Sequence, residues 1–193
     1  MKALLCLLAL IPLAAAAEPQ CLVLDRQNSR VEIDVKATVD SFTGRLEDYT
    51  PVILLDERGD VTSATVSFKF IDVKTGKAER DEQMHVWQET DRHPDGVFKL
   101  ESLTPAADGG GLRASGTLAL HGLVREIDFP VSITRDGSLM AVDGVARLDT
   151  RDFGLPIIRK FLLLKVDPEV VVRFHLQGVP KASDSPNNPV HVP

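Results

Sequence analysis

The stretch from Gly111 to Asp149 has the sequence GLRASGTLALHGLVREIDFPVSITRDGSLMAVDGVARLD. Small or apolar residues alternate with polar residues in three consecutive runs, which is the pattern of strands with one buried face. His121-Gly122 ends the first run, and Asp136-Gly137 is a dipeptide that tolerates positive φ in a tight hairpin turn. The stretch therefore predicts a three-stranded β-meander, whose apolar face another part of the chain must cover.

Further alternating runs lie on both sides of this meander. Strands are predicted at 30–37, 42–46, 52–55, 61–73, 97–103 and 166–179. About eight antiparallel strands with almost no helix predict an all-β fold. A closed eight-stranded β-barrel is favoured because closure removes the exposed strand edges. Periodicity alone leaves a β-sandwich open as the alternative.

Residues 78–89 are different, because acidic residues precede Met84 and Trp87 without strand alternation. This pattern predicts one short helix, whose acidic first turn suits the helix dipole. Thr75 or Asp81 is the expected cap. Met84 and Trp87 need a surface to bury against, so we expect the helix to cover the barrel mouth with these two residues.

The first 17 residues have the organisation of a secretory signal peptide. Lys2 precedes an apolar run and a block of four alanines that suits signal peptidase. The apolar run is shorter than the roughly 20 residues of a membrane-spanning helix, and no later segment approaches that length. We expect cleavage near Glu18 and no integral membrane segment in the product. Cys21 leaves a lipoprotein as the alternative, but the residues before it lack the small and apolar character that lipoprotein processing uses.

The expected organisation is a signal peptide at 1–17, one β-barrel domain at 18–179 and a disordered tail rich in Pro, Asn and Ser at 180–193. Cleavage removes Cys6, so Cys21 remains as a single cysteine and no internal disulfide is possible. The formal net charge of −6 disfavours nucleic acid and anionic membrane surfaces as primary partners. A neutral or apolar ligand suits this chain better, and a homodimer is possible.

The candidate ligand-binding residues are apolar and share the inward face of the predicted strands. They are Val66, Phe68, Phe70, Leu118, Leu120, Val142, Val172 and Phe174. Several residues on that face are small and are expected to leave unfilled volume, namely Ala64, Ala114, Gly116, Gly144 and Ala146. An apolar chain gains about 0.8 kcal/mol per buried methylene, so a long ligand can bind here without specific hydrogen bonds. A solid core is the alternative interpretation of the same face.

No catalytic residue, metal site or cofactor is predicted. The five histidines, at 85, 93, 121, 175 and 191, lack the close pairing of helical zinc motifs, although ligands can converge from separate strands. There is no Gly-x-Ser-x-Gly nucleophile elbow. The carboxylates at 34, 126, 128 and 143 occupy outward strand positions, where solvated charge is expected. Arg80-Asp81 allows two interpretations, a gate at the barrel mouth or a helix cap with a surface ion pair.

Five short stretches follow one another along the exported chain. They are Asn28-Ser29-Arg30-Val31; Ser41-Phe42-Thr43-Gly44-Arg45-Leu46; Val73-Lys74-Thr75-Gly76 with Arg80-Asp81; Gly116-Thr117-Leu118 with His121-Gly122 and Phe129-Pro130-Val131; and Arg151-Asp152-Phe153-Gly154. In this order and spacing they resemble the YceI family of bacterial periplasmic, lipocalin-like, polyisoprenoid-binding proteins.

The resemblance implies a lipocalin-like barrel whose elongated interior holds a long-chain isoprenoid lipid, of polyprenyl or quinone type, or a similar amphiphile. It also implies a periplasmic location and a carrier rather than an enzyme. Asn28 and Thr38 stand where family members often have histidine, so no headgroup preference is carried over. The alternative function is a non-catalytic interaction module of a membrane redox or stress-response system, and an enzyme is a third possibility.

Overall fold

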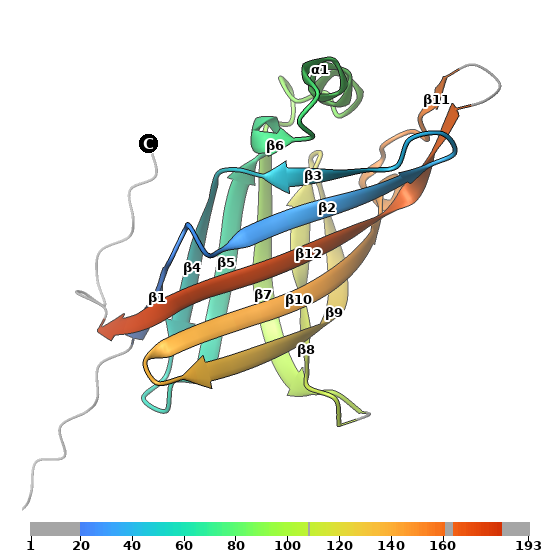
Figure 1. The fold of residues 1–193 in the computed structure, drawn as a ribbon. Coiled ribbons are helices and arrows are strands. Elements are labelled where there is room, and N and C mark those ends of the chain that lie inside the picture. The colour runs from blue at the N-terminus through green and yellow to red at the C-terminus, as the bar shows by residue number, and fades with distance from the viewer. Residues whose placement is uncertain (1–19, 108, 161–163, 183–193) are drawn as a thin grey trace, which may run out of the picture.

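A computed structural model describes residues 20–107, 109–160 and 164–182. The strands are β1 (Gln20–Leu24), β2 (Arg30–Ala37), β3 (Phe42–Leu46), β4 (Tyr49–Leu55), β5 (Val61–Lys69), β6 (Val73–Lys74), β7 (Asp95–Pro105), β8 (Leu112–Leu120), β9 (Leu123–Asp136), β10 (Leu139–Asp149), β11 (Arg159–Lys160) and β12 (Leu164–Ala182). One α-helix, α1 (Ala78–Trp87), and two 3₁₀ turns, η1 (Phe70–Asp72) and η2 (Thr150–Phe153), complete the described part (Figure 1).

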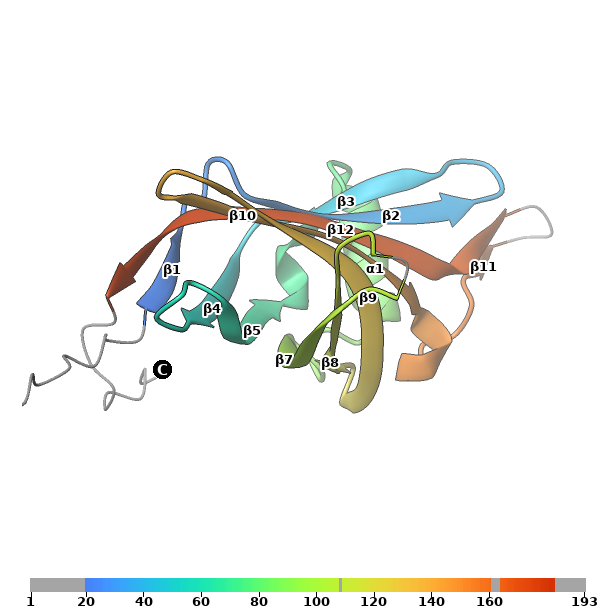
Figure 2. The same ribbon diagram turned by 90° about the horizontal axis from the view of Figure 1, so that it is seen from below.

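Eight of these strands close into an antiparallel barrel. Hydrogen-bonded neighbours follow the order β1-β4-β5-β7-β8-β9-β10-β12, and β12 pairs with β1 to complete the ring. The first half of β12 pairs with β2, which pairs with β3, and β3 pairs with β6. Seen from below, β10, β12 and β2 lie across from β4, β5, β7 and β8 (Figure 2). The barrel prediction is therefore confirmed over the sandwich.

The predicted meander is present as β8, β9 and β10. His121 and Gly122 have φ of 50° and 72°, as both central residues of a type I′ hairpin turn require. Gly137 has φ of 58° in the second turn. β9 begins at Leu123, earlier than the alternation indicated, because Leu123 and Val124 are exposed apolar residues that break the pattern.

One predicted strand in the first half of the chain is wrong, because it is interrupted in the structure. The run predicted as one strand over 61–73 leaves the sheet after Lys69, turns through η1 and resumes as the two-residue β6. At the break, the amide nitrogen of Phe70 donates to the carbonyl oxygen of Pro94 at 2.7 Å. A change of backbone partner leaves the alternation of side chains intact, so the pattern did not show it.

The two ends of the described chain pair with each other, which the sequence did not predict. β1 was missed, because its last four residues, Cys21 to Leu24, are all apolar and show no alternation. It pairs with the end of β12, where Leu22 lies opposite Pro180 and Gln20 opposite Ala182. The tail predicted from Pro180 onward is therefore strand as far as Ala182. The rest of that tail and the predicted signal peptide lie outside the described residues.

The predicted helix is confirmed as α1, and it lies at the upper end of the barrel in Figure 1. Its N-cap, Lys77, makes no side-chain capping bond. The two expected caps instead bind each other, since Oδ1 of Asp81 accepts from the Thr75 amide at 2.9 Å and from its hydroxyl at 2.6 Å. Among the described residues, no helix combines the length and the apolar composition that a membrane span requires.

Filled packing closes the end of the barrel away from α1. Leu22, Leu55, Met140 and Leu176 belong to one apolar cluster, and each is at most 5 % exposed. A second cluster surrounds Phe129 on the meander. These clusters bury the apolar surface that stabilises the barrel.

Candidate functional site

The interior of the barrel contains a cavity of about 840 Å³. This volume lies within the range of roughly 300 to 1,000 Å³ that is usual for small-molecule sites. All eight predicted interior residues and both predicted mouth residues line it, namely Val66, Phe68, Phe70, Leu118, Leu120, Val142, Val172, Phe174, Met84 and Trp87. Their contact with a ligand stays a prediction.

The exposure of the inward side chains distinguishes a cavity from a solid core. Phe68, Val142, Val172 and Phe174 are only half-buried, although they line the interior. Their accessible surface therefore faces the cavity rather than bulk solvent. Leu118, at 6 % exposed, is the most enclosed of the predicted set.

Small residues shape this cavity in two different ways. Ala64, Ala114 and Ala146 line it, as expected from their size. Gly144 does not, because it lies opposite Phe174 in the β10–β12 ladder and a Cβ there would overlap the Phe174 ring. The expectation that Gly144 leaves free volume is therefore wrong, and the volume is occupied by an aromatic ring.

The same relationship occurs on the opposite wall. Gly96 lies opposite Phe68 in the β5–β7 ladder, and a Cβ at this glycine would overlap the Phe68 ring. At Gly116, the second glycine predicted to leave space, a Cβ would collide with the carbonyl oxygen of Lys99. Glycine in these strand interiors marks the close approach of another group.

The helix α1 forms one side of the cavity mouth. Met84 and Trp87 contribute to the cavity wall, whereas Val86 is 74 % exposed on another side of the helix. Nε1 of Trp87 donates to the carbonyl oxygen of Pro156 at 2.8 Å. The segment after η2 also lines the cavity, from Leu155 to Arg159. The mouth is thus bounded by two segments that one hydrogen bond joins.

Charged groups surround this mouth. Nη2 of Arg80 lies 2.7 Å from Oδ2 of Asp40, and the guanidinium carbon lies 4.1 Å from the centre of the Phe42 ring. Nζ of Lys77 lies 3.3 Å from the same Asp40 oxygen. The hydrogen bond from Lys77, followed by the positive charges of Lys77 and Arg80, lowers the pKa of Asp40 below its ordinary value.

The mouth therefore combines a charged rim with an apolar interior. Arg80, Asp40 and Lys77 all line the cavity, together with Glu79, Gln83, Thr150, Arg159 and Asp167. Arg80 thus makes the expected ion pair and also lies at the cavity entrance, whereas Asp81 binds Thr75 beside the helix. Such an arrangement suits a ligand with a long apolar body and a polar end.

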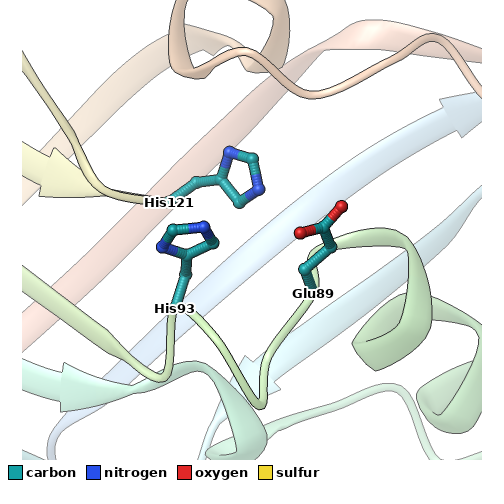
Figure 3. Close-up of side chains that lie close together, drawn as sticks. All are labelled: Glu89, His93 and His121. Carbon is teal, nitrogen blue, oxygen red and sulfur yellow. The ribbon is translucent and has the colours of Figure 1, made fainter.

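The structure also brings together residues that the sequence kept apart. Glu89, His93 and His121 each offer a ligand atom, and these atoms lie within 4.8 Å of one another (Figure 3). His93 and His121 lack the sequence spacing of a helical zinc motif, and their rings come together from separate segments, which is the convergence that the sequence left open. No spacing along the chain indicated the group, because β7 and β8 become neighbours only in the sheet.

The remaining candidates lie elsewhere. His175 is bonded through Nδ1 to Oδ1 of Asp143 at 2.7 Å, and His191 lies outside the described residues. Two of the outward carboxylates form cross-strand ion pairs, Asp34 with Arg173 and Asp128 with Arg113. Exposed pairs of this kind contribute little to stability.

The model of the YceI-like domain family matches residues 22–178, which include the whole ring of strands except its extreme ends. The chain belongs to the YceI family. The match confirms the resemblance seen in the short sequence stretches. A comparison with curated protein sequences found no match.

Solved structures with the YceI-like fold agree with this assignment. BcnA from Burkholderia cenocepacia has 20 % identity and a TM-score of 0.71, over 81 % of this chain and 100 % of BcnA. A polyisoprenoid binding domain from Saccharophagus degradans, implicated in plant cell wall breakdown, has 21 % identity and a TM-score of 0.63, over 86 % of this chain and 100 % of that domain. The YceI protein of Campylobacter jejuni has 15 % identity and a TM-score of 0.59, over 74 % of this chain and 87 % of its own. At these identities the likeness concerns the fold.

Proposed function

We propose that this YceI-family protein is a non-catalytic carrier of a long-chain isoprenoid lipid, of polyprenyl or quinone type, or of a similar amphiphile. The observation that carries the proposal is the cavity of about 840 Å³, which has an apolar wall and a charged mouth. The Saccharophagus degradans neighbour is a polyisoprenoid binding domain with a similar fold, which supports this ligand class.

The driving force for binding is burial of the ligand's apolar chain. Each methylene that leaves water contributes about 0.8 kcal/mol, so a chain of several isoprene units binds through its length. The half-buried side chains, such as Val142 and Phe174, offer the surface that the chain would cover. Lys77 and Arg80 at the mouth would then face the polar end of the ligand.

Mass spectrometry of organic extracts from the purified native protein tests the carrier function. We expect one class of long-chain isoprenoid in the extract. Val142→Trp should reduce the bound lipid, because this side chain lines the cavity. Val145→Trp is the matched control on the same strand, since Val145 is 38 % exposed on the outer face. An extract without lipid, combined with no uptake by the delipidated protein, would favour the interaction module instead.

We also propose that the carrier acts in the periplasm after cleavage near Glu18. The support is the signal-like organisation of the first 17 residues. Fractionation of cells and the intact mass of the recovered protein test this location. A cytoplasmic protein that retains its N-terminus, or a diacylglyceryl group at Cys21, would contradict the proposed export of an unlipidated chain.

A further inference from the structure

A second candidate site lies outside the lipid cavity, where the turn between α1 and β7 meets the β8–β9 turn (Figure 3). Glu89 follows the end of α1, His93 precedes β7, and His121 belongs to the β8–β9 turn. Their ligand atoms lie within 4.8 Å of one another. None of the three residues lines the apolar cavity, so the lipid proposal does not account for the group.

The hydrogen bonding of His121 leaves one ring nitrogen available. Nδ1 lies 2.8 Å from the carbonyl oxygen of Phe153, which can only accept, so Nδ1 carries the proton. Nε2 therefore presents a lone pair, and it is buried without a hydrogen-bond partner. Buried polar atoms are rarely left unsatisfied. A backbone carbonyl that orients one ring nitrogen while the other faces an ion is a common arrangement of metal-binding histidine.

The backbone around the group adopts unusual conformations. Among the described residues, Glu89 and His121 are the two non-glycine residues with positive φ, at 52° and 50°. The β8–β9 hairpin turn requires this conformation of His121, so the turn itself sets the position of the His121 side chain. Gly122 lets the His93 ring approach, since a Cβ there would lie 3.1 Å from its Cε1. The centres of the two imidazole rings are 4.5 Å apart.

Buried hydrogen bonds hold the turn that carries Glu89 and His93. The His93 amide donates to the Glu89 carbonyl oxygen at 3.0 Å. Nε2 of Gln88, a fully buried side chain, donates to the His93 carbonyl oxygen at 3.0 Å, and its Oε1 accepts from the Thr90 hydroxyl at 2.7 Å. The turn is thereby organised before any ligand binds.

We propose that Glu89, His93 and His121 bind a divalent transition-metal ion of the zinc type. Two imidazoles and one carboxylate are ligands that zinc accepts, and three protein ligands leave a coordination position for water. Zinc–nitrogen bonds of about 2.0–2.1 Å place tetrahedral ligand atoms about 3.3 Å apart, so modest side-chain rotations complete the site. Nη1 of Arg92 lies 2.8 Å from Oε2 of Glu89, and this exposed pair is weak enough for an ion to displace.

A bound ion would join the turn after α1 to the β8–β9 turn of the barrel wall. Because His121 also binds the Phe153 carbonyl of η2, the ion would connect three segments near the mouth. An ion that binds only the folded state raises its stability. Metal addition should therefore raise the melting temperature, whether or not lipid is present.

Titration of the tag-free, chelator-treated protein with Co²⁺ and Zn²⁺ tests the site. We expect one ion per chain, visible d–d absorption with Co²⁺, and displacement of Co²⁺ by Zn²⁺. His93→Ala and Glu89→Gln should each weaken affinity at least about ten-fold, because each removes a ligand. Glu89 is exposed, so its variant keeps the fold intact.

His175→Ala is the matched control, because His175 is a half-buried histidine bonded to Asp143 elsewhere on the barrel. It should bind metal as the unaltered protein does, and the melting temperature of each variant without metal reports its folding. Equal affinity in the unaltered protein and Glu89→Gln, or the same loss in His175→Ala, would overturn the proposal. Absence of one-to-one binding would do so as well.

Discussion

Nε1 of Trp87 donates a hydrogen bond of 2.8 Å to the carbonyl oxygen of Pro156. The two residues are far apart in the sequence, one on α1 and the other after η2, and both line the cavity. This bond holds the helix against the opposite side of the mouth. A ligand that enters between the two segments would have to pass it.

Trp87→Phe should therefore loosen the mouth while it preserves an aromatic ring. We expect release of a fluorescent isoprenoid to become faster, with a stability loss of about 0.5 kcal/mol, because an exposed hydrogen bond contributes at the low end of the usual range. Stopped-flow release and urea unfolding measure the two effects. Val86→Ala on the exposed side of the helix is the control. An unchanged release rate in Trp87→Phe would assign this bond a purely structural role.

Trp87 should also report ligand binding, because it is the single tryptophan of the chain and lies on the cavity wall. Addition of a long-chain isoprenoid to the delipidated protein should change its emission spectrum. Tryptophan fluorescence, compared with binding measured independently by a radiolabelled lipid, checks this. Measured binding with a constant spectrum would place the ligand away from α1.

Phe68→Trp distinguishes an occupied cavity from a packed core. The larger ring should project into the cavity, shorten or weaken the bound chain and change the stability of the delipidated protein only modestly. In a solid core the same substitution overpacks the interior and costs roughly 1–3 kcal/mol with or without lipid. Thermal unfolding of the loaded and delipidated forms, together with the lipid affinity of the delipidated protein, distinguishes the occupied cavity from the solid core. Intact affinity with equal destabilisation of both forms would argue for a core.

Gly144→Ala should displace the Phe174 ring, because a Cβ at this position overlaps it. Because Phe174 lines the cavity, we expect the displaced ring to reduce the space for the ligand and weaken lipid binding, together with a stability loss of roughly 1–3 kcal/mol. A second substitution, Phe174→Leu, should restore part of the lipid binding and part of the stability, since it removes the overlap. Denaturant unfolding of the single and double variants measures the coupling. Simple additivity would show that the two positions act independently.

Asp40→Asn should weaken the attachment of α1 through Lys77 and Arg80. The pKa of Asp40 in the folded protein lies below its ordinary value of 3.8, chiefly because Lys77 donates a hydrogen bond to the carboxylate. A lowered folded-state pKa adds stability above pH 3.8, and this contribution disappears as the pH falls through the folded-state pKa. The melting temperatures of the two proteins should therefore differ near neutral pH and converge in acid.

High salt provides the control for this prediction, because screening weakens exposed ion pairs. The difference in melting temperature at neutral pH should shrink in 1 M salt. A difference that persists in acid and in high salt would mean that the substitution acts through something other than the charge of Asp40.

Local patterns in the sequence contain the information for the elements of this fold. Alternation from Leu112 to Leu148 predicted the meander, because apolar residues at every second position give each strand one buried face. A slip of one residue would turn these apolar side chains outward, so the pattern also determines which face is buried. The absence of alternation around Met84 predicted the helix. The inward residues, such as Phe68 and Phe174, followed from the same parity, and the ordered short stretches indicated the family before any comparison.

Pairing between distant residues was beyond these patterns, because alternation reports which face a side chain takes and not which strand lies beside it. Closure of the barrel depends on Gln20 meeting Ala182, and the shape of the cavity depends on Gly144 meeting Phe174. His93 and His121 are 28 positions apart in the sequence, and only the pairing of strands in the sheet brings their two turns side by side. Periodicity is a property of one segment, whereas the ring, the mouth and the histidine group arise from contacts that form only when the whole chain folds.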